Sequence, residues 1–296
     1  RLQGDWSSDV CSSDLEKQMK KILLASTALV ATTGFAAAEM SWSGSANMGM
    51  TYSDEGTTKV HTEIDLGMAA TGETDGGIGW KVEMGLDSNT TDATQGGGHD
   101  VGSVSITGDF GTIRVGAAGT AGTTVGIGDV GFDGSAIDTA AHKGRHTGST
   151  APDVQWNYSM DDIAIHASTE TSTDDTAVAL SWTSGSMAIA VSHSAAGASA
   201  ATANALSVGT SVGGFAVEVT AASHSTAAYD SVGMSASMPV DGLGTVTFIT
   251  GSNDTDAQSS YGLGFAKALG GGATLKGYYG SNNGNDVADL GIGFSF

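Results

Sequence analysis

The chain has 296 residues, and its 32 acidic side chains outnumber its 11 basic ones, which gives a formal net charge of −21. This acidity disfavours nucleic acid as a partner and favours cations, although a soluble or halophilic protein with an acidic surface has the same composition. The only cysteine, Cys11, excludes a disulfide framework. No run reaches the roughly 20 apolar residues that a membrane helix needs.

Residues 19–38 have the pattern of a secretory signal peptide. They begin at Met19, continue with two lysines and a short apolar stretch, and end in three alanines at 36–38. The apolar stretch is too short for a membrane anchor and ends in a cleavage site. We therefore expect a mature domain over 39–296. Residues 1–18 fit neither the leader nor the domain, and we interpret them as a non-native extension.

Three successive runs, 40–52, 58–70 and 77–87, alternate strictly between apolar and polar side chains. Since side chains alternate across a β-strand, each run is predicted to be a strand with one apolar and one polar face. Every Lys, Asp and Glu of the second and third runs lies on the polar face. Such confinement of charge is typical of a barrel with lipid outside and water inside.

Alternation continues to the end of the chain with one long interruption, at 118–151. The sixteen predicted strands form an all-β, antiparallel transmembrane β-barrel, and their even number places both termini on the same side. Ser88–Gly98 is expected to be a surface loop. An aperiodic stretch as long as 118–151 is usually functional. After the first three runs, the predicted strands are 99–108, 111–117, 152–160, 162–170, 176–183, 186–194, 204–212, 215–223, 229–239, 243–251, 258–268, 272–280 and 285–296.

The aperiodic stretch contains three carboxylates, Asp129, Asp133 and Asp138. In a narrow lumen they would act on every passing ion, because the screening length in physiological salt is roughly 8 Å. They could instead be solvated carboxylates on the cell surface. The barrel pattern and the length of the stretch favour the lumen.

The same stretch concentrates positive charge at His142, Lys143, Arg145 and His146. We predict that these side chains form an electrostatic clasp that folds the loop against the barrel wall. Two histidines four residues apart suit a metal ion when they lie on a helix, whereas glycine interrupts this segment. No metal site is therefore expected here.

Motifs of an enzyme are missing from the sequence, which has no nucleophile elbow, zinc motif or phosphate loop. Neither an enzyme nor a cofactor is expected. Carboxylate pairs such as Asp254 with Asp256, or Asp174 with Asp175, could bind Ca²⁺ weakly, but they lack an EF-hand loop and are simpler to explain as solvated turns.

Several segments carry a resemblance to a known family: Tyr261-Gly-Leu-Gly, Leu269-Gly-Gly-Gly-Ala-Thr, residues 287–296, and residues 108–116 just before the aperiodic stretch. They are similar to segments of the alphaproteobacterial general porins of the Rhodobacter type. The resemblance covers the whole mature chain, strongly at its two ends and weakly through 118–255.

The resemblance implies a homotrimeric barrel whose third long loop, here 118–151, folds into the lumen as an acidic constriction. In that family the second strand carries arginines that face the loop. The matching region here has Glu63 and Asp65 instead, which predicts a more uniformly negative pore. The terminal Phe296 resembles the signal by which the barrel-assembly machinery recognises its substrates.

We therefore predict a non-enzymatic porin in the outer membrane of a Gram-negative bacterium, surrounded by outer-membrane lipid. It would pass small hydrophilic solutes passively and prefer cations. A secreted or surface-layer structural β-protein is the first alternative, and it would be soluble without detergent. An outer-membrane enzyme of barrel form is the second, and the sequence offers no catalytic set for it. The predicted selectivity residues are Glu63, Asp65, Glu83, Asp129, Asp133 and Asp138, with Lys81 and Arg114 as counter-charges.

Overall fold

The computed structural model describes residues 38–54, 56, 58–91, 94–99, 102–132, 140–142, 145–149, 152–225 and 229–296, with the backbone alone at 88–91 and 94–99. The predicted extension, and the predicted signal peptide up to residue 37, lie outside these residues. Within the described parts of the chain, no helix is long and apolar enough to cross a bilayer.

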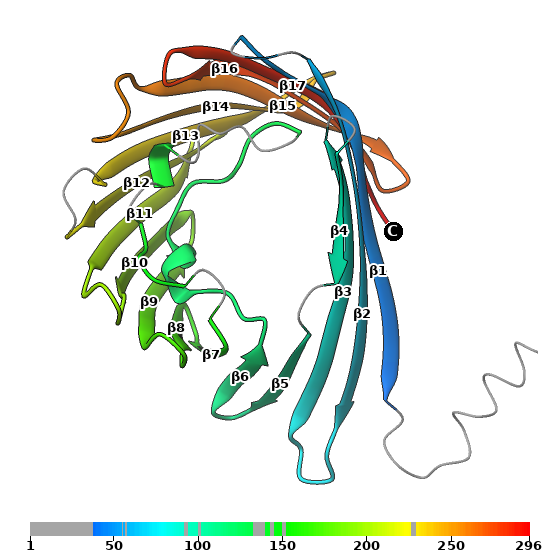
Figure 1. Cartoon of the computed structure of the whole chain (residues 1–296), viewed down its shortest axis with the longest axis vertical. Helices are drawn as coiled ribbons and strands as arrows, with labels where there is room; N and C mark the ends of the chain where they lie inside the picture. Colours follow the sequence, from blue (N-terminus) through cyan, green and yellow to red (C-terminus); the bar gives the residue numbers. More distant parts are fainter. Residues whose placement is uncertain are drawn as a thin grey trace, which may run out of the picture.

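Antiparallel strands form one closed ring (Figure 1). They are β1 (Glu39–Ser53), β2 (Lys59–Glu73), β3 (Gly79–Thr91), β4 (Thr94–His99), β5 (Ser103–Gly108), β6 (Gly111–Gly116), β7 (Val154–Met160), β8 (Ile163–Glu170), β9 (Asp175–Ser184), β10 (Met187–Ala195), β11 (Thr202–Val212), β12 (Phe215–His224), β13 (Ser231–Val240), β14 (Gly244–Asn253), β15 (Ser260–Gly270), β16 (Ala273–Asn282) and β17 (Asn285–Ser295).

The ring closes between the first and last strands, where Ser45 of β1 lies opposite Ser295 of β17. The C-terminal part of β3, residues 86–91, pairs with β4, and its N-terminal part, residues 79–83, pairs with β5. The seventeen strand segments therefore fill sixteen positions, so the predicted sixteen-stranded barrel is confirmed. Closure pairs the first strand with the last, as a membrane-spanning sheet requires, while β4 pairs with β3 alone among the described residues.

One predicted connection is wrong. Ser88–Gly98 was expected to be a surface loop, but β3 runs on to Thr91 and pairs with β4 as a hairpin, with Leu86 opposite His99. The predicted strand 99–108 is accordingly divided between β4 and β5. The glycine- and threonine-rich segment lacks apolar alternation because, in this hairpin, strand pairing does not depend on an apolar face.

Large apolar side chains cover the outer face of the barrel, as the alternation predicted. Trp42 is 70% exposed and Tyr279 is 61% exposed, which is normal only when the surrounding medium is lipid. Trp42 of β1, Trp80 of β3 and Trp182 of β9 lie near one end of the barrel, and Tyr52 of β1, Tyr261 of β15 and Tyr279 of β16 lie near the other end. This distribution matches two aromatic girdles.

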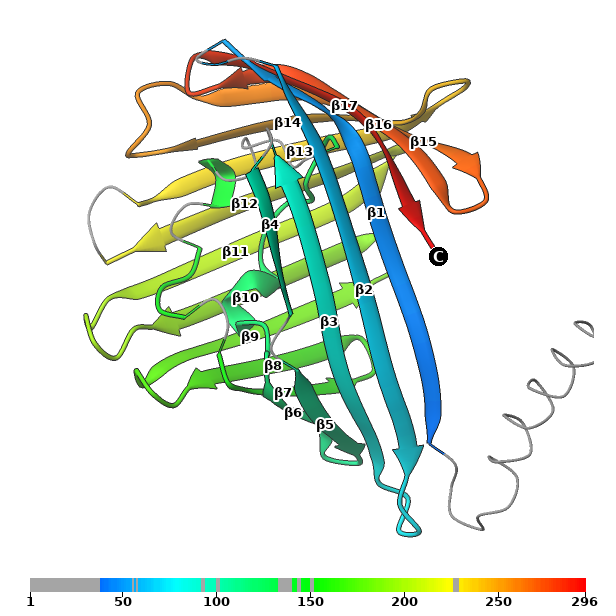
Figure 2. The same cartoon turned by 45° about the vertical axis from the view of Figure 1, so that its right-hand side comes forward.

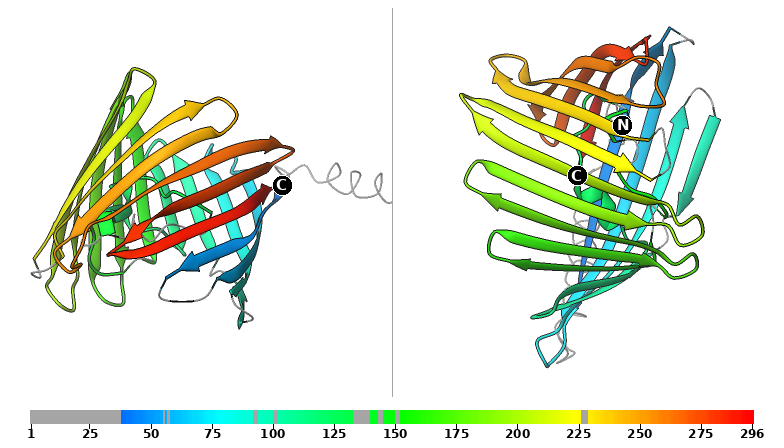
Figure 3. Two further views of the ribbon diagram at one scale, coloured as in Figure 1. Left: turned by 90° about the horizontal axis from the view of Figure 1, so that it is seen from above. Right: turned by 90° about the vertical axis from the view of Figure 1, so that its left-hand side faces the viewer.

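The two ends of the barrel differ in their connections (Figures 2 and 3). One end, which we call the short-turn end, has tight turns such as Gly213-Gly214, where both residues have positive φ as a two-residue hairpin turn requires. The other end, the long-loop end, carries the connection between β6 and β7, residues 117–153. Short turns face the periplasm in bacterial barrels, so the long-loop end faces the cell exterior.

Candidate pore constriction

The described parts of residues 117–153, which we call the constriction loop, lie inside the ring of strands (Figure 1). The loop begins with a 3-10 helix, η1 (Ala121–Thr124). The backbone N–H of Ala121 donates to Ser168 Oγ of β8 at 2.9 Å. Ala121 also packs against Ala177 and Ala179 on the inner face of β9. Small side chains on the wall thus allow the loop backbone to approach it closely.

The next part of the loop crosses the inner wall of β10–β12. Val125 is fully buried and packs against Ala190, Ala205 and Ala222, one alanine from each of these strands. Burying a valine side chain contributes about 1.5–3 kcal/mol relative to leaving it in water. The loop is therefore attached to the wall by apolar packing as well as by hydrogen bonds.

Further along, the loop packs against the wall of β14 and β16. Ile127 and Val130 form an apolar cluster with Ile249 and Tyr278, both of which point inward from their strands. Ala141, from the returning limb of the loop, completes the cluster. An inward-pointing isoleucine in a water-filled barrel would be costly, and the loop provides its apolar cover.

Phe132 anchors the loop on the far side of the lumen. Its ring fills a notch at Gly49 of β1 and Gly291 of β17, where a Cβ atom on either glycine would overlap the ring. The backbone N–H of Phe132 donates to Asp289 Oδ1 at 3.0 Å. The ring also lies edge-on against His61 of β2, with centroids 5.5 Å apart. The loop thus spans the barrel from β7 to the seam between β1 and β17.

The returning limb is joined to the outgoing limb by the predicted clasp residues. His142 Nε2 accepts a hydrogen bond from the Ile127 N–H at 2.8 Å, and Arg145 Nη1 donates to the Val125 carbonyl at 3.3 Å. These contacts join two limbs of the loop through backbone groups. The Cβ of His146 lies close to Gly122. Lys143 lies outside the described residues.

The returning limb is also attached to the wall. The Thr147 N–H donates to Ser194 Oγ of β10, and the Ser149 N–H donates to Asp175 Oδ2 of β9 at 2.7 Å. Ser231 Oγ of β13 donates to the Ala141 carbonyl at 3.1 Å. The loop therefore has wall contacts on both limbs, and these provide partners for several of its backbone groups in the lumen.

Burial lowers the pKa of His146, and the neighbouring Arg145, His142 and His224 lower it further. Its Nδ1 is buried and has no hydrogen-bond partner among the described residues. Both observations favour the neutral imidazole. The packing of the loop around His146 is therefore more stable at neutral pH than at acidic pH.

Two of the predicted selectivity residues, Glu63 and Asp65, lie together on the inner face of β2, and Asp87 of β3 joins them. Each offers a carboxylate oxygen, and these oxygens lie within 4.8 Å of one another. Asp65 and Asp87 are directly opposite in the strand register. Ser45 Oγ donates to Asp65 at 2.9 Å, and Asn47 Nδ2 donates to Glu63 at 3.2 Å. We call these three residues the carboxylate cluster. Such oxygens could share a divalent cation.

Glu83 has a different environment from the other predicted carboxylates. Lys81 Nζ lies 2.5 Å from Glu83 Oε1, and Arg114 Nη2 lies 3.5 Å from Glu83 Oε2. Arg114 Nε also donates to Ser103 Oγ at 2.9 Å. We call Lys81, Glu83 and Arg114 the mixed-charge group. It has a net charge of about +1 at neutral pH, since two cations face one carboxylate.

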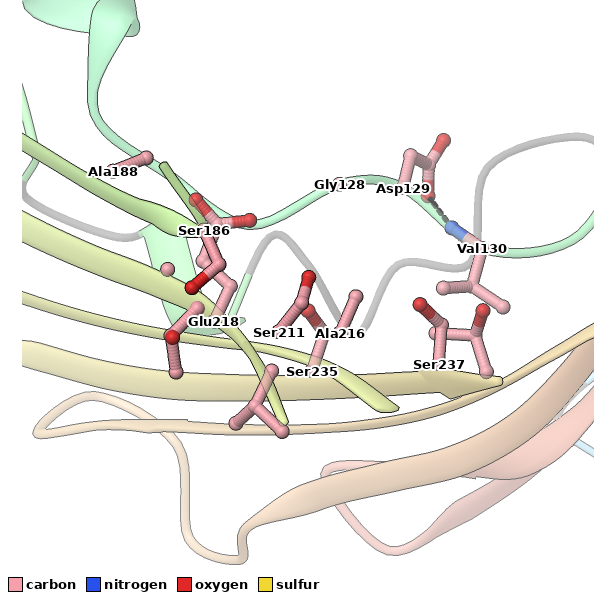
Figure 4. Close-up of a pocket in the computed structure, with 14 residues that line it drawn as sticks. Gly128, Asp129, Val130, Ser186, Ala188, Ser211, Ala216, Glu218, Ser235 and Ser237 are labelled. Carbon is pink, nitrogen blue, oxygen red and sulfur yellow. Dashed lines mark hydrogen bonds between the residues drawn. The ribbon is translucent and has the colours of Figure 1, made fainter. Parts of the chain in front are cut away.

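Asp129 lies apart from both groups, over the wall of β10–β14. Asp129 and Glu218 of β12 both line a hollow of about 400 Å³, and Figure 4 shows Asp129 on the loop and Glu218 on the wall. Asp129 Oδ1 accepts from the Val130 N–H at 2.8 Å. Asp133 and Asp138 lie outside the described residues. Of the three predicted loop carboxylates, the structure therefore places one.

Three features escaped the sequence analysis. Asp87 was assigned only to the polar face, although counting back from the turn at 74–78 would have paired it with Asp65. Glu218 was not among the predicted selectivity residues, although it lines the same hollow as Asp129. The notch that receives Phe132 had no local signal, because its two glycines come from opposite ends of the chain.

A closed β-barrel with an apolar exterior, a polar interior and an inserted loop defines a transmembrane channel of the bacterial outer membrane. Residues 25–295 match the Gram-negative porin family, and the chain belongs to this family. It is therefore an outer-membrane porin. This assignment decides against a secreted structural β-protein.

Solved structures with a similar fold include mutants of the porin from Rhodopseudomonas blastica. A mutant with one glutamate replaced by methionine, and an aspartate and a glutamate replaced by alanine, is 18% identical with a TM-score of 0.77; the match covers 87% of this chain and 100% of that chain. A related mutant with two further basic residues replaced by alanine is 18% identical with a TM-score of 0.76, at the same coverage. At this identity the likeness shows the fold alone. No curated protein sequence matches the chain.

Proposed function

We propose that this porin passes small hydrophilic solutes by passive diffusion and prefers cations, as a general porin of the Rhodobacter type. The observation that carries the cation preference is the carboxylate cluster on the inner wall of β2 and β3. The Glu63 side chain is 30% exposed, so it can act on ions in the lumen.

The balance of charge on this wall supports the preference. Three carboxylates of the cluster stand against the single net positive charge of the mixed-charge group. At physiological ionic strength the screening length is roughly 8 Å, so closely spaced carboxylates in a narrow lumen attract each passing cation together. Asp129 and Glu218 add negative charge on the opposite stretch of wall.

The test is the reversal potential of the purified protein in a planar bilayer with a KCl gradient across it. We expect a reversal potential whose sign indicates a preference for K⁺ over Cl⁻. In the variant E63Q/D65N/D87N this potential should shift toward zero. The matched control is D75N/D162N/D241N, which removes the same charge from the short turns. Equal reversal potentials in the wild type and the cluster variant would remove the cluster as the selectivity determinant.

We further propose that the porin is a homotrimer, as the resemblance implies. Closed rotational symmetry is the usual arrangement of such assemblies, and the apolar outer face offers surface for subunit contact as well as for outer-membrane lipid. Conductance steps that occur in threes, together with a trimer mass in detergent, are the expected results.

The chain ends suggest how the mature protein forms. β1 begins at Glu39, and we propose that a signal peptide over 19–38 is removed before it. The terminal Phe296 is 69% exposed, and its backbone exchanges hydrogen bonds with Gly44 at 2.8 and 3.0 Å. We propose that Phe296 is read by the barrel-assembly machinery. Mass determination of the secreted protein tests the first proposal, and the yield of folded protein after deletion of Phe296 tests the second.

A further inference from the structure

We propose that the mixed-charge group is the centre of a binding subsite for small hydroxylated monocarboxylates, such as sugar acids, on the inner wall at the short-turn end. The proposal deepens the channel function, since it names a class of solute that the lumen would hold. It starts from a hollow of about 450 Å³ whose lining includes Lys81, Glu83 and Arg114.

The register of three strands brings the two cations together. Lys81 of β3 lies opposite Ser105 of β5, and Ser105 lies opposite Arg114 of β6. Neighbouring strands are about 4.8 Å apart, so the Lys81 and Arg114 backbones are about 10 Å apart. Side chains of this length can reach one ligand from both sides. Their side chains are 44% and 35% exposed, so both are accessible from the lumen.

Both cations keep donors for a ligand. An ammonium has three N–H donors and a guanidinium has five. Within the described part of the chain, Lys81 has one partner, Glu83, while Arg114 uses Nε for Ser103 and Nη2 for Glu83. The remaining donors are available to a carboxylate, and a charge-assisted hydrogen bond to an anion is among the stronger ones that proteins make.

The surroundings select the kind of anion. The other polar side chains of the hollow are neutral hydroxyls and amides, which exchange hydrogen bonds with ligand hydroxyl groups: Thr71, Ser105, Thr107, Thr112, Gln155 and Asn157. Glu83 would repel a second negative charge. One carboxylate and several hydroxyl groups therefore match the hollow better than a dicarboxylate, a phosphate dianion or an apolar acid.

The carboxylate cluster does not cancel this positive group. Lys81 and Asp87 are six residues apart on β3, which is about 20 Å along an extended strand. This distance exceeds the screening length of roughly 8 Å. The mixed-charge group is therefore separate from the carboxylate cluster along the wall, while Glu39 of β1 and Glu73 of β2 are carboxylates on the same face as Lys81.

The experiment is a titration with potassium gluconate at constant ionic strength. One readout is the current through single channels in a planar bilayer, and the other is calorimetry of the detergent-solubilised porin. We expect saturable interruption of the current and saturable heat with gluconate. Glucose, which lacks the charge, and propionate, which lacks the hydroxyls, should each give a clearly weaker response.

The variants separate a site from a general charge effect. K81Q and R114Q should each weaken gluconate binding about tenfold, as expected for the loss of one charged hydrogen bond. E83Q should tighten binding, because it removes the competing carboxylate. The matched control is K276Q, which removes one positive charge from the inner wall of β16, away from the hollow. The affinity of this variant for gluconate should stay within about twofold of that of the wild type.

Open channels without saturable gluconate binding would overturn the subsite and leave the channel function intact. Equal responses to gluconate and glucose would also overturn the subsite. An equal loss of gluconate affinity in K276Q and K81Q would do the same. Calorimetric binding in a preparation that forms no channels would support the subsite and contradict the proposed channel function, so the two failures are distinguishable.

Discussion

The ring of Phe132, on the constriction loop, meets the imidazole of His61, on β2, at an interplanar angle of 87° and a centroid distance of 5.5 Å. Edge-to-face pairs of this kind contribute about 0.5–1.5 kcal/mol beyond their buried area. His61 is 3% exposed and Phe132 is 6% exposed. The contact therefore links the far end of the loop to the strand that carries Glu63 and Asp65.

Phe132→Ala should loosen the far end of the loop and enlarge the pore. Removing a buried phenylalanine side chain costs about 3–5 kcal/mol when the structure cannot collapse around the space. We expect a larger and noisier single-channel conductance than in the wild type. Phe132→Leu is the control, since it keeps an apolar side chain in the notch and should restore most of the quiet current. An unchanged conductance in Phe132→Ala would show that the ring does not hold the loop.

Gly291→Ala should produce a similar defect from the wall side. A Cβ atom at this position would overlap the Phe132 ring and force it out of the notch. The matched control is Gly209→Ala on β11, where a new Cβ meets no atom closer than 3.9 Å. We expect higher conductance noise in the first variant and wild-type behaviour in the second. Similar noise in both would mean that wall glycines are needed for strand geometry rather than for the notch.

His142→Ala should weaken the junction between the two limbs of the loop. It removes the acceptor of the Ile127 N–H, and an unsatisfied, partly buried N–H costs about 1–3 kcal/mol. Proteolysis of the loop in intact barrels would measure the change, with faster cleavage expected. His142→Gln keeps a side-chain acceptor and should be cleaved more slowly than His142→Ala. Equal cleavage rates in both variants would count against this hydrogen bond.

The constriction loop should lose stability in acid through His146. Its pKa in the folded loop is lowered from the ordinary value of 6.5, so the unfolded loop binds the proton more readily. The contribution is complete above pH 6.5 and is lost as the pH falls through that value toward the lowered pKa. Current noise should therefore increase on titration from about pH 7 to about pH 5. His146→Asn should flatten this dependence, and an unaltered pH profile in that variant would assign the effect to other groups.

Apolar alternation predicted most of the barrel because it reflects a single physical requirement. A strand between lipid and water must place apolar and polar side chains on opposite faces, and runs such as 58–70 and 77–87 satisfy it at every charged position. The β3–β4 hairpin was missed because its glycines, threonines and asparagine show no such alternation. There the pairing is made between backbone groups, which local hydropathy does not report.

The candidate site was less accessible to prediction, since its groups depend on register and on loop packing. The structure places Glu63 and Asp65 in the carboxylate cluster, and it places Lys81 and Arg114 at the hollow beside Glu83. Predicting that Glu83 pairs with two cations would have required knowing that β3, β5 and β6 are neighbours in the sheet. The anchoring of Phe132 required the closure of β1 onto β17, which brings Gly49 and Gly291 together.

The anchors of the constriction loop and the charged groups of the wall lie on largely different segments of the chain. The loop is held largely by β8–β17 and β1, whereas the carboxylate cluster and the mixed-charge group come from residues 59–116. One short, continuous stretch of the gene can therefore be exchanged or randomised to alter which solutes cross, provided that His61, which contacts Phe132, is kept.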